Sequence, residues 1–150
     1  MKLITFAIPS YNSEKFLASC LDSLLIGIDE KIEAIVINDG STDKTSEIAH
    51  EYSKKYPFIK VVDKENGGHG SGINVGIVNA TGLYFKMFDS DDHVDKEGLL
   101  SLIEIIEKHL NLCHDNLELP VELVCTMSCS EVSTSRTFLS QKLIIGSSSN

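Results

Sequence analysis

The feature that most constrains the fold of this chain is a regular alternation of short apolar runs with segments of helical periodicity. Four apolar runs of strand length occur, at residues 3–8, 32–37, 59–62 and 83–88. A helical segment follows each run; the first begins near Ser13, with Phe16 on its apolar face, and the last begins near Lys96. Because strands that alternate with helices need crossover connections, the sequence predicts an α/β fold with a mostly parallel sheet and helices on both faces.

The length and composition fit one domain. With 150 residues and 42% hydrophobic content, the chain can bury a core of its own. The alternation extends to about residue 110. Beyond it the pattern weakens: residues 123–126 could form one more strand, and residues 146–150 are small and polar, which predicts a disordered tail. We therefore divide the chain into an organised part, residues 1–110, and residues 111–150, a partial continuation with a disordered tail.

The charge of the chain excludes one class of partner and limits another. A formal net charge of −9 argues against nucleic acid, because phosphate backbones are bound by clustered Lys and Arg. Arg136 is the only arginine, and the lysines are scattered. A diphosphate bound to this chain would therefore need a metal ion.

The N-terminal segment bears on location. The apolar run from Leu3 to Ile8 ends at Pro9, which makes it too short for a signal-peptide core or a membrane span. The sequence therefore predicts a cytoplasmic protein with no transmembrane segment.

Polar residues follow three of the predicted strands, at residues 9–12, 38–40 and 89–92. In open α/β sheets, ligands bind beyond the carboxyl ends of the strands. Each cluster alone could be an ordinary turn, since Asp, Asn and Gly are common there. Their convergence on one edge of the sheet predicts a ligand site.

The third cluster, Asp89 to Asp92, has three carboxylates in four residues. Such groups repel one another unless a cation or strong donors neutralise them. Oxygen ligands suit Mg²⁺ or Mn²⁺, which keep positions open for phosphate oxygens. The alternative is a solvated turn that caps the helix beginning near Lys96.

A glycine-rich segment follows the third predicted strand, with glycines at positions 67, 68, 70, 72 and 76. Glycine allows the backbone to approach closely to a ligand or to a neighbouring strand. The segment is neither a P-loop nor a dinucleotide fingerprint, because it lacks the Gly-Lys-Ser/Thr sequence and does not follow the first strand.

Six short segments, in this order and spacing, resemble the GT-A glycosyltransferases of family 2: Ile8 to Asn12, Asn38 to Asp43, Asn66 to Gly68, Asn74 to Gly76, Ala80 to Gly82, and Asp89 to Asp92. The resemblance covers residues 3–110. It implies a GT-A, Rossmann-like fold in which residues 1–110 are the nucleotide-sugar-binding half and the C-terminal part is incomplete.

The resemblance also implies roles for particular residues. Pro9 and Tyr11 would line the nucleotide base, and Asp39 would accept a hydrogen bond from a uracil ring. Asp89 would face the ribose and the sugar, and Asp91 would bind the metal, Mn²⁺ or Mg²⁺, that bridges the two phosphates. Asn66 and Gly67 complete the implied nucleotide-sugar site, and Asp89 is the second implied metal ligand.

The implied activity is metal-dependent transfer of a sugar from a nucleotide-diphospho-sugar, with UDP-sugar as the donor class. The acceptor would be a saccharide, a lipid or a protein, and the anomeric centre would be inverted. A lipid-linked acceptor would add peripheral membrane association. Similar proteins carry the catalytic base in a second half of the domain that has no match here, so no residue is assigned to that role.

Two positions and two other functions stay open. Ile73 stands where similar proteins often carry an arginine, and His69 is either a donor to a ligand or simply solvated. A truncated or diverged nucleotide-binding fragment without transfer activity is one alternative. A metal-dependent phosphohydrolase is another, with Ser10 or Tyr11 as its weak candidate nucleophiles.

Overall fold

The computed structural model describes residues 1–113 and 140–141. Its elements, in chain order, are β1 (Ile4–Ser10), α1 (Leu17–Ser23), β2 (Ile32–Asp39), α2 (Thr45–Lys55), β3 (Ile59–Lys64), α3 (His69–Asn79), β4 (Tyr84–Met87), α4 (Lys96–Cys113) and β5 (Ser140–Gln141). The strand predicted at 123–126 and the tail predicted at 146–150 lie outside the described residues.

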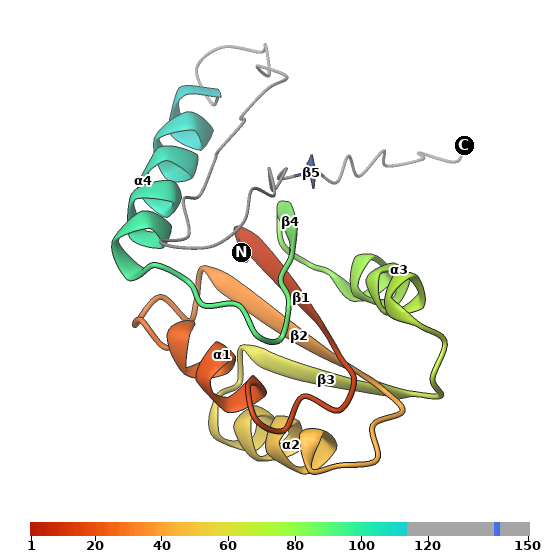
Figure 1. The fold of residues 1–150 in the computed structure, drawn as a ribbon. Coiled ribbons are helices and arrows are strands. Elements are labelled where there is room, and N and C mark those ends of the chain that lie inside the picture. The colour runs from red at the N-terminus through yellow and green to blue at the C-terminus, as the bar shows by residue number, and fades with distance from the viewer. Residues whose placement is uncertain (114–139, 142–150) are drawn as a thin grey trace, which may run out of the picture.

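The sheet has the strand order β3-β2-β1-β4-β5 (Figure 1). The pairs β3/β2, β2/β1 and β1/β4 are parallel, and β5 pairs antiparallel with β4. The prediction of a mostly parallel sheet is confirmed. The chain moves outward from β1 to β3 and then crosses to the other side of β1, so the order reverses between β1 and β4.

Helices cover both faces of the sheet, as the sequence predicts. Alternate side chains of the central strands, including Phe6 and Ile8 of β1 and Val36 of β2, pack in one core with buried residues of α1, α2 and α4. Ala7, Ile35 and Ile37 point to the other face, where Val75 of α3 packs against them. Both β1 and β2 are buried along their whole length, which explains their unbroken apolar runs. No helix within the described residues is long and apolar enough to cross a membrane.

The first helix begins later than predicted. Periodicity placed its start near Ser13 and put Phe16 on its apolar face, but α1 begins at Leu17 and Phe16 is 52% exposed. The Ser13 carbonyl accepts hydrogen bonds from the amides of Phe16 and Leu17, which form a turn before the helix. The Ser13 hydroxyl donates to the Tyr11 carbonyl and bonds Ser90, so it does not cap the helix. The Ser13 hydroxyl is therefore used in tertiary contacts and not at the start of α1.

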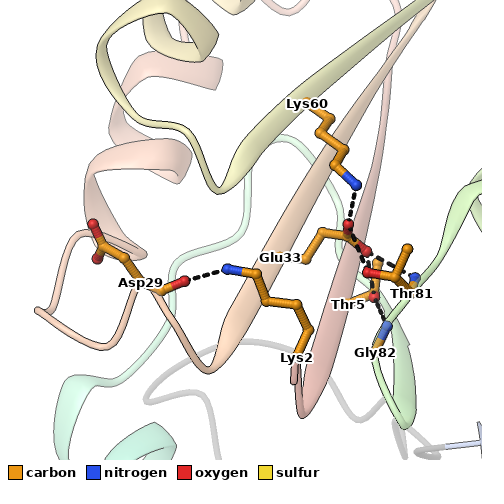
Figure 2. Close-up of polar contacts among 7 residues, drawn as sticks. All are labelled: Lys2, Thr5, Asp29, Glu33, Lys60, Thr81 and Gly82. Carbon is orange, nitrogen blue, oxygen red and sulfur yellow. Dashed lines mark hydrogen bonds and ion pairs between the residues drawn. The ribbon is translucent and has the colours of Figure 1, made fainter.

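A buried glutamate joins three strands at the amino ends of β1 and β2 (Figure 2). Glu33 accepts hydrogen bonds from the Thr5 hydroxyl, the Thr81 amide, the Thr81 hydroxyl and the Lys60 ammonium group. The Gly82 amide in turn donates to the Thr5 hydroxyl. Burial raises the pKa of Glu33, but the donors, led by Lys60, hold it below its ordinary value. Thr81 and Gly82 therefore fix the turn that leads into β4.

Two glycines let α3 lie very close to β1. A Cβ on Gly76 would stand 2.6 Å from the Cβ of Ala7, and one on Gly72 would stand 3.1 Å from the Cβ of Pro9. Both glycines are buried. The sequence left two uses open for the glycine-rich segment, close approach to a ligand or to a neighbouring strand. Gly72 and Gly76 serve the approach to the strand.

We expect Gly76→Ala to lower the free energy of unfolding by about 1–2 kcal/mol, because overpacking a rigid contact costs more than the helix propensity of alanine returns. Gly70 is the matched control in the same helix, since a Cβ there meets nothing within 4 Å. Gly70→Ala should raise the stability by about 0.5 kcal/mol. Urea denaturation of both variants measures the difference, and equal shifts of the same sign would contradict the packing account.

Candidate functional site

The three predicted polar clusters lie at one edge of the sheet. Residues 9–12 span the end of β1, residues 38–40 span the end of β2, and residues 89–92 follow β4 after Phe88. Ser10 is in register with Asn38, and the Phe88 amide donates to the Ala7 carbonyl, so the three ends are adjacent. This edge includes the point between β1 and β4 where the strand order reverses, which is where open α/β sheets form their binding crevices.

A pocket of about 360 Å³ opens at the ends of β1 and β2. It is lined by Pro9, Ser10, Tyr11, Asp39, Asn66, Gly68 and His69. Four of the predicted nucleotide-site residues, Pro9, Tyr11, Asp39 and Asn66, are thus brought together. Of these, Pro9 is buried and Tyr11 is 53% exposed.

Asp39 is the most constrained side chain in the pocket. Its Oδ1 accepts hydrogen bonds from the Gly67 amide, at 2.9 Å, and from the Lys64 ammonium group, while Oδ2 accepts from the Gly68 amide at 2.9 Å. Burial raises the pKa of Asp39, but Lys64 and the two amides outweigh it and hold the pKa below its ordinary value. The group is therefore an ionised acceptor with lone-pair capacity left on Oδ2.

Sequence reasoning missed Lys64, which it counted among scattered lysines. Asp39 and Lys64 are partners in the parallel pairing of β2 with β3, and their charged groups form an ion pair in which Asp39 is 6% and Lys64 17% exposed. They are far apart in the sequence, so the strand register was the only signal that could have revealed the pair.

Gly40 brings the glycine-rich loop against the end of β2. Its φ is +69°, in the left-handed region that favours glycine, and a Cβ there would stand 2.8 Å from the Asn66 nitrogen. Asn66 can lie against the end of β2 and line the pocket because Gly40 has no side chain in its way. Gly67 does not line the pocket, but its amide holds Asp39 in place.

The acidic segment lies outside the pocket lining, beside the first helix. Asp89, Asp91 and Asp92 are exposed. Burial and the charges of Asp89 and Asp91 raise the pKa of Asp92, so the carboxylates are close enough to repel one another as the sequence predicts. The Cys20 thiol, under this segment, donates to the Asp89 carbonyl at 3.7 Å. Burial and the charges of Asp92, Asp91 and Asp89 raise the pKa of the Cys20 thiol to about 12.

The residues present fit a cation that is shared with a ligand. Within residues 1–113, no group of three or more His, Cys, Asp or Glu side chains is arranged to hold a metal by itself. Mg²⁺ and Mn²⁺ sites that act on phosphates need only one or two carboxylates, because the phosphates and water supply the rest. Asp89 and Asp91 match that donor set. Both are exposed, and their charges raise the pKa of the neighbouring Asp92 carboxyl.

One serine connects the pocket to the acidic segment. The Ser13 hydroxyl donates to the Tyr11 carbonyl at 3.3 Å and forms a 2.8 Å hydrogen bond with the Ser90 hydroxyl. The Ser13 amide donates to the Thr45 hydroxyl at the start of α2. A residue that the sequence marked only as the expected start of the first helix thus ties the two parts of the site together.

The two histidines near the site have different settings. His69, the first residue of α3, is exposed and lines the pocket. His93 follows the acidic segment, and its Nε2 forms a 2.7 Å hydrogen bond with the Ser19 hydroxyl. Ile73, at the position where similar proteins often carry an arginine, is half-buried on α3.

A mostly parallel sheet with this order and a pocket at its carboxyl edge define an α/β protein of the class that binds ligands at the carboxyl ends of its strands. Residues 5–115 match the model of Glycosyl transferase family 2. The chain therefore belongs to glycosyl transferase family 2, and the resemblance found in the sequence is confirmed.

Particular relatives agree with that assignment. The chain is 39% identical over 107 residues to the uncharacterized glycosyltransferase EpsJ of Bacillus subtilis (strain 168), a match that covers 71% of this chain and 31% of EpsJ. The crystal structure of residues 1–349 of S. aureus TarS in complex with UDP is 35% identical, with a TM-score of 0.65, over 73% of this chain and 33% of that one. The chain thus spans about a third of these relatives.

A more distant structure supports the fold alone. The mannosyltransferase PcManGT from Pyrobaculum calidifontis superposes with a TM-score of 0.56 at 22% identity, over 64% of this chain and 30% of that one. The GT-A fold predicted from the six segments is therefore also confirmed by structural similarity.

Proposed function

We propose that residues 1–110 form the donor-binding half of a metal-dependent glycosyltransferase that uses a UDP-sugar, with residues 111–150 as a partial continuation of the domain. The observation that carries this proposal is the joining of the nucleotide-sized pocket to the acidic segment through Ser13 at one sheet edge. A donor that has a base at one end and a diphosphate at the other needs two such subsites side by side.

The pocket supports uracil as the base. Asp39 is an ionised acceptor, and the uracil ring presents an N–H donor that can bond Oδ2. Pro9 and Tyr11 supply apolar surface for the ring, and Asn66 adds an amide with both donor and acceptor capacity. TarS, at 35% identity, was crystallised with UDP.

The acidic segment supports a metal-bridged diphosphate. Asp91 and Asp89 would hold Mn²⁺ or Mg²⁺, with Asp89 also facing the ribose. When bound, the ion neutralises the phosphates and stabilises the departing nucleoside diphosphate. Ile73 supplies no charge where an arginine is common, and the chain carries a net charge of −9, so phosphate binding depends more heavily on the metal.

The transfer reaction needs groups beyond this site. We propose inversion at the anomeric carbon, with a carboxylate base that removes a proton from the acceptor hydroxyl. No residue among those described is assigned as that base. The acceptor is a saccharide, a lipid or a protein, at the cytoplasmic side, with peripheral membrane association if it is lipid-linked.

Titration of UDP into the chain by calorimetry, with Mn²⁺ and again with EDTA, tests the donor site. We expect UDP affinity to fall by at least about tenfold when the metal is removed, because two phosphate charges then meet an acidic surface. Uridine, which has no phosphate, is the matched control and should bind equally under both conditions. Absence of UDP binding in Mn²⁺ would contradict the proposal.

A second assay separates a transferase from a nucleotide-binding module. The chain is incubated with UDP-sugars and Mn²⁺, and release of UDP is followed over time. Release by the parent chain, with water as the acceptor of the sugar, supports transfer chemistry. UDP binding without any release would instead support the fragment that binds nucleotide without transfer activity.

A further inference from the structure

The acidic segment is held beside α1, and beside the turn that precedes it, by hydrogen bonds to three serine hydroxyls. The Ser90 hydroxyl bonds Ser13, the His93 ring bonds Ser19, and the Val94 amide donates to the Ser23 hydroxyl at 3.1 Å. Ser13, the earliest of the three serines in the chain, contacts the start of the acidic segment, and Ser23, the latest, contacts its end. The segment therefore runs alongside α1 in the same direction (Figure 1).

The spacing on the helix makes this contact possible. Ser19 and Ser23 are four residues apart, so they lie on the same side of α1, and Cys20 lies next to them. The Ser23 hydroxyl also donates to the Cys20 carbonyl at 2.6 Å, so its position is fixed by its own helix while it accepts from Val94. Ser23 is thus a rigid acceptor rather than a mobile surface hydroxyl.

These contacts stand on both sides of Asp91. Ser90 comes before it, and His93 and Val94 come after it. Ser90 is half-buried and turned to Ser13, whereas its neighbours Asp89 and Asp91 are exposed. The residues around them are fixed, while the two carboxylates themselves are exposed and accessible to a ligand.

We propose that Ser13, Ser19 and Ser23 are positioning residues: they hold the Asp89–Val94 segment on α1, so that the two carboxylates are ordered before the metal and diphosphate bind. The inference rests on the proposed function. Its physical basis is preorganisation, because a loop that is ordered in the free protein loses less conformational entropy when it binds a ligand.

The test compares Ser23→Ala with Ser53→Ala in the 150-residue chain. Ser53 is a matched control, because its hydroxyl also donates to the carbonyl three residues earlier in its own helix, α2. Three quantities are measured: amide hydrogen exchange of residues 89–94, the Kd for UDP in Mn²⁺, and the Kd for uridine. Ser23→Thr, which keeps the hydroxyl, serves as the rescue variant.

We expect Ser23→Ala to accelerate exchange at Val94 and to weaken UDP binding in Mn²⁺ by about five- to tenfold, the usual effect of one lost hydrogen bond. Uridine binding should stay unchanged, Ser53→Ala should match the parent, and Ser23→Thr should restore both quantities.

Two results overturn the inference alone. The first is an unchanged Kd for UDP in Ser23→Ala when Mn²⁺ strengthens UDP binding to the parent. The second is an equal loss of UDP and uridine affinity in Ser23→Ala, which indicates a general structural effect. A parent chain whose UDP affinity does not respond to Mn²⁺ contradicts the proposed function, and the inference falls with it.

Discussion

Replacing Asp39 with alanine is expected to lower the free energy of unfolding by about 3 kcal/mol, because it leaves the Lys64 ammonium group, whose side chain is 17% exposed, without its carboxylate partner. The amides of Gly67 and Gly68 lose their acceptor in the same step, so the loop that forms one wall of the pocket loosens. Uridine affinity should fall by about a hundredfold, since the bond to an ionised acceptor and the ordered loop disappear together.

Asp43→Ala is the control for this variant. The Asp43 carboxylate also accepts hydrogen bonds from two backbone amides, those of Glu14 and Thr45, but it does not line the pocket. We expect Asp43→Ala to lose stability and to keep its affinity for uridine. Urea denaturation and calorimetry measure the two quantities, and normal uridine binding by Asp39→Ala would remove Asp39 from the site.

The pH dependence of stability provides an independent check. The pKa of Asp39 is lower in the folded protein than its unfolded value of about 3.9, so its contribution is complete above that pH and is lost as the pH falls through the folded pKa. The parent should therefore lose stability on acidification below about pH 4. The loss should be smaller in Asp39→Ala, and identical acid profiles would contradict the role given to Lys64 and the two amides.

Replacing Asp91 with alanine is expected to weaken UDP binding in Mn²⁺ by about two orders of magnitude, because a divalent ion between a carboxylate and a phosphate contributes several kcal/mol. Binding in EDTA should hold or strengthen slightly, because one carboxylate that repels the phosphates is removed. Stability should hold or rise slightly, since Asp91 is exposed and one of the charges that repel Asp92 is removed.

Asp29→Ala is the control for charge. Asp29 is an exposed carboxylate just before β2, at the opposite end of the strands, and its removal changes the net charge by the same amount (Figure 2). It should bind UDP in Mn²⁺ as the parent does. If Asp91→Ala also matches the parent, the metal does not bind at Asp91 and the ligand assignment is wrong.

Much of the fold was predictable, because its signals are local. A strand buried on both faces needs a continuous apolar run, and β1 and β2 show one. The start of α4 at Lys96 also agrees with the sequence, where the apolar spacing marks it. The start of α1 was not predictable, because Ser13 bonds Ser90, which is distant in the sequence.

The candidate site divides in the same way. Polar residues after strands indicated the edge of the sheet, and Pro9, Tyr11, Asp39 and Asn66 do meet in one pocket there. The roles of these residues, and those of Asp89 and Asp91, stay predictions until ligand binding is measured.

The sequence by itself determined the strand–helix order, the family and the acidic segment, because each depends on residue types at short, fixed spacings. Only the tertiary structure decided that Lys64 pairs with Asp39, that Gly76 serves packing rather than a ligand, and that serines of α1 hold the acidic segment. Those facts depend on strand register and on how closely a helix approaches a sheet. Both result from the free energy of the whole packed domain, so no short stretch of sequence carries them.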